Sequence, residues 1–89
     1  MEVIKIGAEW CSGCIIMKPR WAEIEKENNW LKTQYYDYDK DKSIIEKYNI
    51  DEEIPVFIFL NKEKQEISRL IGETSKEKLL SIIHQYKNK

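Results

Sequence analysis

Two cysteines separated by two residues, Cys11 and Cys14, are the residues of this 89-residue sequence whose spacing points most directly to chemistry. The thiolate is the nucleophile of thiol–disulfide exchange, whereas a free cysteine at neutral pH is mostly thiol. At the N-terminus of a helix, unpaired backbone N–H groups and the positive end of the dipole favour the anion. We therefore expect Cys11 to be the exposed, attacking sulfur. Cys14, one helical turn later, should be more buried and should resolve the mixed disulfide.

Metal binding is an alternative use of the pair. A structural zinc site needs four ligands, but the sequence contains no third cysteine, and its one histidine, His84, lies near the end of the chain. Zinc shared between two chains and an inert pair of core cysteines remain as alternatives. The sequence also lacks a glycine-rich nucleotide motif. We expect no metal and no bound cofactor, only a redox-active Cys11–Cys14 disulfide.

The first half of the chain predicts the elements that position the two cysteines. Residues 2–7 are rich in β-branched side chains and predict a strand. Apolar residues at three- and four-residue steps predict a helix from residue 12 to about residue 28. Pro19 lies inside that pattern and should kink the helix without ending it, because the apolar stripe continues beyond it. A second strand is expected over residues 34–38.

The second half predicts a short helix, a hairpin and a final helix. Asp39 or Asp41 is suited to cap the short helix. The apolar run at residues 56–60 predicts a buried strand, which pairs with a strand over residues 66–71 in an antiparallel hairpin. Thr74 with Glu77 forms a capping-box pattern before the last helix.

This order of elements, β-α-β-α-β-β-α, predicts an α/β fold. A right-handed β-α-β unit followed by a helix, a hairpin and a helix gives a four-stranded mixed sheet with helices on both faces. At 89 residues, the whole of 1–89 should form one domain with a single core.

Composition excludes several other classes of protein. The 15 Lys and Arg residues nearly balance 16 Asp and Glu, so no basic field favours nucleic acid. The longest apolar run, residues 54–60, is too short to cross a bilayer, and the N-terminus lacks the pattern of a secretory signal. We expect a cytoplasmic monomer that binds neither nucleic acid nor membrane. In that compartment two cysteines are not expected to serve as a structural staple.

Residues 8–14 (AEWCSGC) resemble the Ala-Glu-Trp-Cys-Gly-Pro-Cys segment of the thioredoxin family. Pro19 stands where that family carries a helix-kinking proline, and Ile54-Pro55 resembles its Ile followed by a cis proline. The resemblance implies a compact thioredoxin fold without the family's additional N-terminal strand and helix. It also implies a cis Pro55 beside the sulfurs, with the backbone around Ile54 pairing with substrate as an extra strand.

The same resemblance implies a substrate-binding surface around the cysteines. Its members would be Trp10, Ser12, Gly13, Ile54, Pro55, Glu53 and Gly72. Trp10 is expected to form a half-exposed apolar platform, and Trp21 to lie in the core. The acidic residues 51–53 would bring negative charge to the substrate groove and favour basic partners. A solvated acidic loop without a role is the alternative.

Lys5 marks the main departure from the family. Thioredoxins usually carry a buried aspartate six residues before the first cysteine, and here that position is Lys5. A cation near the sulfurs would stabilise thiolates, so Lys5 is a candidate to tune Cys14. Alternatively, its stem packs while its ammonium reaches solvent.

The function that these residues favour is reduction of protein disulfides, with electrons drawn from a thioredoxin-reductase-like donor. Two alternatives stay open. One is a redox protein of another kind, either an oxidant or isomerase or a glutaredoxin-like protein. The other is a non-catalytic binding module built on the same fold.

Overall fold

The computed structural model describes residues 1–87, which form four strands and three helices in the order expected from the sequence. These elements are β1 (Glu2–Gly7), α1 (Ser12–Glu27), β2 (Lys32–Asp37), α2 (Lys42–Lys47), β3 (Val56–Leu60), β4 (Glu66–Ile71) and α3 (Lys76–Tyr86). The last two residues of the expected 1–89 domain lie outside the described part.

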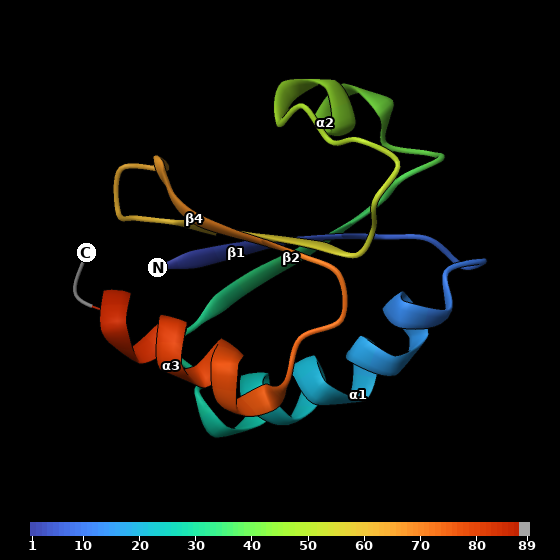
Figure 1. Ribbon diagram of the computed structural model, residues 1–89. Helices are drawn as coiled ribbons and strands as arrows, with labels where there is room; N and C mark the ends of the chain where they lie inside the picture. The colour runs from blue at the N-terminus through green and yellow to red at the C-terminus, as the bar shows by residue number, and fades with distance from the viewer. Residues whose placement is uncertain (88–89) are drawn as a thin grey trace.

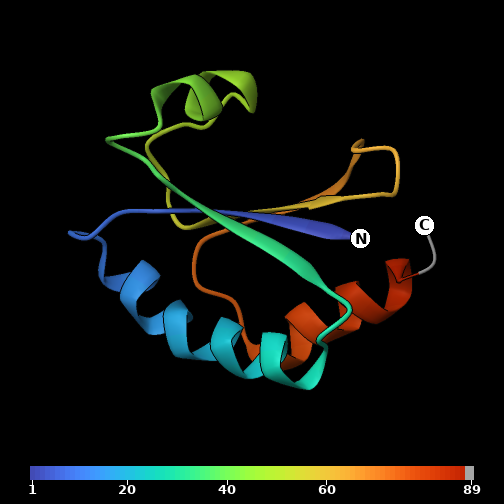
Figure 2. The same cartoon turned by 180° about the vertical axis from the view of Figure 1, so that it is seen from behind.

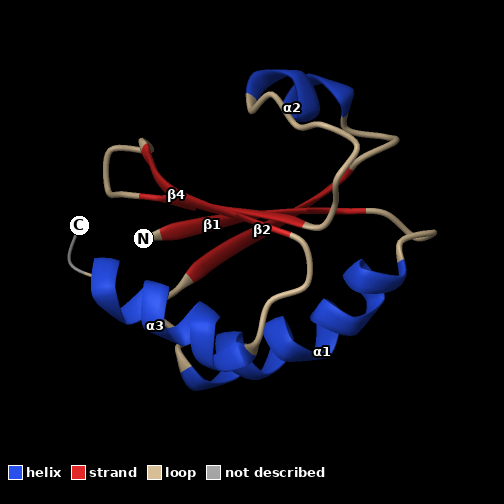
Figure 3. Ribbon diagram, viewed as in Figure 1, coloured by secondary structure: helices blue, strands red, loops and turns tan. Residues whose placement is uncertain are grey.

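The four strands form one mixed sheet in the order β2-β1-β3-β4. β1 runs parallel to β2 and antiparallel to β3, while β3 and β4 form the expected antiparallel hairpin. All five residues of β3 are buried because this strand is central in the sheet and covered on both faces. Figure 3 shows the strands edge-on, as a layer between helices. The predicted mixed sheet is therefore confirmed.

Helices cover both faces of the sheet. α1 and α3 lie together on one face and α2 lies on the other (Figure 1), an arrangement that the view from behind also shows (Figure 2). Successive side chains on β1 point to opposite faces of the sheet, so they pack into different core clusters. Val3 joins the core cluster beneath α1 and α3, whereas Ile4 and Ile6 join the cluster beneath α2.

Helix α1 follows the apolar stripe that the sequence predicts. Met17, Trp21 and Ile24 are buried against the sheet. Pro19 lies inside the helix, which continues to Glu27. Asn28 closes the C-terminal end, where its backbone N–H and its side-chain amide both donate to the Ile24 carbonyl.

One helix cap differs from that predicted, and another stands at a predicted residue without a side-chain cap bond. Ser75, not Thr74, caps α3, and its hydroxyl accepts a hydrogen bond from the Lys78 backbone N–H. The Thr74 hydroxyl donates instead to the Gly72 carbonyl. Asp41 stands at the N-cap of α2 but makes no side-chain cap bond, because its carboxylate accepts from the backbone N–H of Asp37.

Strand boundaries agree with the sequence pattern within two residues. β2 spans Lys32–Asp37 instead of residues 34–38. Its ends are set by its parallel pairing with β1, in which residues 2–7 lie beside residues 32–37. Within residues 1–87, no helix is long and apolar enough to cross a membrane.

Candidate functional site

Cys11 stands at the N-cap of α1, at the junction that the sequence predicts. Its backbone is extended, and its sulfur accepts a hydrogen bond from the Cys14 backbone N–H at 3.3 Å. The Cys11 thiol in turn lies 3.6 Å from the Ile54 carbonyl oxygen, to which it donates. A first-turn N–H directed at a sulfur favours negative charge there. The local geometry therefore suits Cys11 to act as a nucleophile.

The expected difference in exposure between the two cysteines was wrong. Cys11 is only 8% exposed, whereas Cys14 is partly exposed. The loop that carries Ile54 and Pro55 covers Cys11, and Cys14 lines an open cavity. Helical spacing alone does not reveal either effect, because the covering loop comes from 43 residues further along the chain.

The Ile54–Pro55 loop is packed directly on the start of α1. The peptide bond between these residues is cis. A Cβ atom added to Gly13 would lie 3.3 Å from the Pro55 Cδ atom, so glycine permits this close approach. On the other side of the loop, the Gly72 backbone N–H donates to the Pro55 carbonyl at 2.7 Å. Gly13, Ile54 and Pro55 therefore meet around Cys11, and Gly72 is joined to them through Pro55.

Apolar side chains are exposed next to the cysteines. Trp10 is 63% exposed, and its indole N–H donates to Asp39 at 2.6 Å while its ring meets Tyr38 edge-on. Ile15 and Ile16 are exposed on the first turns of α1, where Ser12 is also exposed. A fixed indole beside exposed isoleucines is suited to contact the apolar surface of another molecule.

Glu53 lies on a different side of the loop from the cavity that Cys14 lines. It is exposed, and it lines a second, smaller cavity of about 160 Å³ together with Arg69 and Ile71 of β4. Arg69 is held by a two-point ion pair with Glu66, which raises the pKa of its guanidinium. The acidic loop thus has a basic neighbour.

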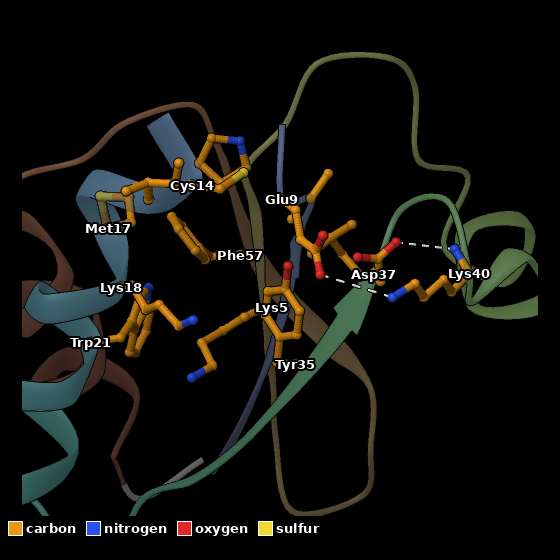
Figure 4. Close-up of a pocket in the computed structure, with 15 residues that line it drawn as sticks. Lys5, Glu9, Cys14, Met17, Lys18, Trp21, Tyr35, Asp37, Lys40 and Phe57 are labelled. Carbon is orange, nitrogen blue, oxygen red and sulfur yellow. Dashed lines mark hydrogen bonds and ion pairs between the residues drawn. The ribbon is translucent and has the colours of Figure 1, made fainter. Parts of the chain in front are cut away.

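The larger cavity, of about 500 Å³, opens on the Cys14 side of the site. Lys5 lines it, but its ammonium forms an ion pair with Glu25 at 2.9 Å and lies 5.7 Å above the Trp21 ring. In Figure 4 the Lys5 side chain extends toward Trp21, away from Cys14. A lysine paired in this way serves to join β1 to α1; its proposed influence on Cys14 stays a prediction.

Tyr35 and Gly7 are two residues of this site that the sequence analysis missed. A Cβ atom on Gly7 would lie 3.1 Å from both the Cys14 sulfur and the Tyr35 hydroxyl oxygen. The space that Gly7 leaves open is thus shared by these two groups. The available signal was a glycine in the last position of a strand rich in β-branched residues, which marks a close approach.

Burial raises the pKa of the Cys14 thiol from 9.0 to about 12, and the hydrogen bond with Cys11 adds to the effect. In the unfolded chain the same thiol would ionise near pH 9. Between these two values the unfolded state releases a proton that the folded state retains. The neutral Cys14 thiol therefore contributes its full share to the free energy of unfolding below pH 9. That contribution is lost as the pH rises toward 12.

Reduced protein should therefore lose more stability than a Cys14→Ser variant when the pH is raised. Serine cannot ionise in this range, while the other titrating groups are common to both proteins. Denaturant unfolding at pH 8 and pH 10.5, in excess reductant, measures the difference. An equal loss in both proteins would contradict the raised pKa.

Comparison with known proteins places this geometry in a family. Residues 1–85 match the family model for thioredoxin. Rice thioredoxin H-type is 33% identical over 70 residues, covering 79% of this chain and 56% of the rice protein. Chlamydia caviae thioredoxin is 29% identical over 86 residues, covering 97% and 82% of the two chains. Corynebacterium nephridii thioredoxin C-3 matches over 79% of this chain and 47% of its own length.

Solved structures agree with this match. Fasciola hepatica thioredoxin superposes with a TM-score of 0.86 at 26% identity, covering 96% of this chain and 79% of the other. The thioredoxin NaTrxh of Nicotiana alata, at 22% identity, gives a TM-score of 0.87 over 96% and 71% of the two chains and shares the fold. The chain therefore has the thioredoxin fold. It belongs to the thioredoxin family of redox proteins.

Among residues 1–87, no cluster of three or more His, Cys, Asp or Glu side chains is arranged to hold a metal ion.

Proposed function

We propose that this chain reduces protein disulfides through dithiol–disulfide exchange at Cys11 and Cys14. One observation carries the proposal: Cys11 is the N-cap of α1, its sulfur accepts the Cys14 backbone N–H at 3.3 Å, and the cis Ile54–Pro55 loop covers it. The sulfur that attacks and the sulfur that resolves are thus one helical turn apart. This spacing makes the second step intramolecular.

Exchange proceeds in two steps with two electrons passing to the substrate. In the first, the Cys11 thiolate attacks a substrate disulfide, one substrate sulfur leaves as a thiolate and takes a proton, and a mixed disulfide forms. In the second, Cys14 loses its proton and attacks the Cys11 sulfur. The Cys11–Cys14 bond forms, the second substrate thiol is released, and the protein is left oxidised.

Substrate binding is proposed for the surface around Cys11. Trp10, Ser12 and Gly13 border it on the helix side, and Ile54, Pro55 and Gly72 on the loop side. The exposed apolar atoms of Trp10 and Ile15 favour a protein partner over a small polar disulfide. An unfolded or flexible segment that presents a disulfide would fit best, because it can lie along the Ile54–Pro55 backbone.

The oxidised form requires an electron donor to complete a cycle. We propose a thioredoxin-reductase-like donor and a reducing compartment such as the cytoplasm, because two cysteines are kept as thiols there. We further propose that the chain acts as a monomer, as one domain and without a bound cofactor. Transfer of electrons then needs only the two sulfurs.

The wild-type chain is expected to accelerate reduction of a disulfide-containing protein such as insulin by dithiothreitol, and Cys11→Ser to abolish the acceleration. The serine hydroxyl is not a thiolate and cannot form the mixed disulfide. The turbidity of the released insulin chains measures the rate. Ser81→Ala, on the exposed face of α3, is the matched control and should retain the wild-type rate. Acceleration by Cys11→Ser equal to that of wild type would overturn the proposal.

The acidic residues Glu52 and Glu53 are proposed to favour basic substrates through the rate of association. In Glu52→Gln/Glu53→Gln, the preference for a basic over an acidic disulfide peptide should fall by about twofold to tenfold at low salt. Reduction rates of the two peptides, measured at low and high ionic strength, test this. An unchanged ratio of the two reduction rates would reject the role of Glu52 and Glu53 in substrate choice. Neutralisation of the acidic loop by nearby Arg69 would then explain the result.

A further inference from the structure

Tyr35 approaches the sulfur of Cys14 from strand β2. Because β1 and β2 are parallel with Lys5 beside Tyr35 and Gly7 beside Asp37, Tyr35 shares the α1 face of the sheet with Lys5 and Gly7. Gly7 has no side chain to fill the space diagonal to Tyr35. The Tyr35 hydroxyl oxygen and the Cys14 sulfur each lie 3.1 Å from the point where a Gly7 Cβ would stand. They are therefore no more than twice that distance, 6.2 Å, from each other.

Both groups border the same 500 Å³ cavity, and it is open to solvent. Tyr35 as a whole is 55% exposed, so its ring forms one wall of the cavity mouth. Figure 4 shows its hydroxyl directed into the cavity, toward the side where Cys14 lies. A small rotation of the side chain, or one water molecule, would connect the hydroxyl to the sulfur.

The lysine side chains around the cavity are paired with carboxylates or directed away from Cys14 (Figure 4). Lys5 pairs with Glu25, and Lys40 lies 3.9 Å from Glu9. Lys18 extends beside Lys5 and Trp21 in Figure 4, away from Cys14. The ionisable groups that line the cavity besides Cys14 and Tyr35 are Lys5, Glu9, Lys18, Asp37 and Lys40.

The thiolate form of Cys14 needs a neighbouring group that stabilises its negative charge. Its pKa of about 12 leaves it almost fully protonated at neutral pH, yet it must attack as a thiolate to resolve the mixed disulfide. Partial burial raises the pKa of Tyr35, and the nearby Asp37 and Cys14 raise it further. The hydroxyl therefore keeps its proton at neutral pH and remains a hydrogen-bond donor.

We propose that the Tyr35 hydroxyl stabilises the Cys14 thiolate that attacks the mixed disulfide by donating a hydrogen bond to it. The inference rests on the proposed exchange reaction and adds one residue to its second step. Cys14 gives its proton to water in the cavity, and the departing substrate thiolate takes one up. Tyr35 keeps its own proton, while the Cys11–Cys14 bond forms and the Cys11–substrate bond breaks.

Tyr35→Phe keeps the ring and removes only the donor. Loss of a hydrogen bond to a charged group should lower the Cys14 thiolate fraction about tenfold. A more basic thiolate is also more nucleophilic, so the net effect on the rate of attack should be about threefold. Reaction with an aromatic disulfide such as dithiobis(nitrobenzoate) releases one chromophore at the first step and one at the second. The second phase should slow about threefold and the first should not change.

Tyr36→Phe is the matched control. Tyr36 is the next residue on β2, packs on the opposite face of the sheet, and donates its hydroxyl hydrogen bond to Gln34. It should leave both phases unchanged. Lys5→Met provides the comparison with the other candidate: a slower second phase in Lys5→Met but not in Tyr35→Phe would overturn the inference in favour of Lys5.

A second measurement does not depend on turnover. In a Cys11→Ala background, alkylation of Cys14 by iodoacetamide between pH 7 and pH 11 reports the thiolate directly. Tyr35→Phe should slow alkylation about threefold throughout this range. A purely structural role would open the cavity and speed alkylation, so an equal or faster rate would overturn the inference. If alkylation slows while wild type reduces no disulfide, the proposed function fails, and only the hydrogen bond from Tyr35 to the Cys14 thiolate stands.

Discussion

Reduced protein with Cys14→Ser will accumulate a covalent complex with its disulfide substrate, joined through Cys11. Cys11 can still attack, since the Cys14 backbone N–H that donates to its sulfur is unaffected by the substitution. The mixed disulfide then lacks its intramolecular resolving thiol, so turnover should fall at least about a hundredfold. Non-reducing electrophoresis, followed by mass spectrometry of the linked peptides, measures both the amount and the position of the bond.

Cys11→Ser is the control for this experiment and should form no such complex. The comparison matters because Cys14 is the more exposed residue, whereas Cys11 is 8% exposed. If access to solvent decided which sulfur attacks, Cys14 would form the complex instead. A linked peptide containing Cys14 in the Cys11→Ser variant, at a similar rate, would reverse the two roles.

Phe59→Ala should cost about 3–5 kcal/mol of unfolding free energy. Phe59 lies on the central strand β3, is fully buried, and belongs to the core cluster beneath α1 and α3. Truncation leaves a cavity that the flanking strands cannot close. Since domains of this size are stable by only about 5–15 kcal/mol, a large part of the total would be lost. Urea unfolding monitored by circular dichroism gives the change.

Ile71→Ala on β4 is the matched control, because Ile71 is 55% exposed. Its substitution should cost less than about 1 kcal/mol. Comparable losses in the two variants would contradict the burial of Phe59 in the core cluster beneath α1 and α3.

The order of elements could be predicted because each one carries a local signal. The unbroken apolar run at β3, the three- and four-residue steps of α1 and the turn before β4 identify strand, helix and hairpin without any knowledge of contacts. The family resemblance of residues 8–14 added the identity of the site, and the match over residues 1–85 confirms that family.

Properties that depend on contacts between distant segments could not be predicted in the same way. The exposure of Cys11 is set by the Ile54 carbonyl above it, and that of Cys14 by the empty place beside Gly7. Tyr35 has no motif of its own, and only the parallel pairing of β1 with β2 brings it to this face of the sheet.

The predicted cap of α3 was wrong for a related reason. Thr74 and Ser75 are both competent N-cap residues, and the sequence pattern favoured the first. In the structure Thr74 is buried with its hydroxyl donating to Gly72, which leaves Ser75 to cap α3. The tertiary environment of Thr74 therefore decided between two local solutions of similar energy.

The reduction potential of the Cys11–Cys14 couple tests the proposed direction of electron flow most directly. The protein is equilibrated in thiol–disulfide buffers of known potential, and its reduced fraction is measured after acid quenching and thiol labelling. A disulfide reductase should show a single two-electron transition near about −270 mV. A transition near about −120 mV, typical of a strong oxidant, or the absence of a two-electron transition, would contradict the account.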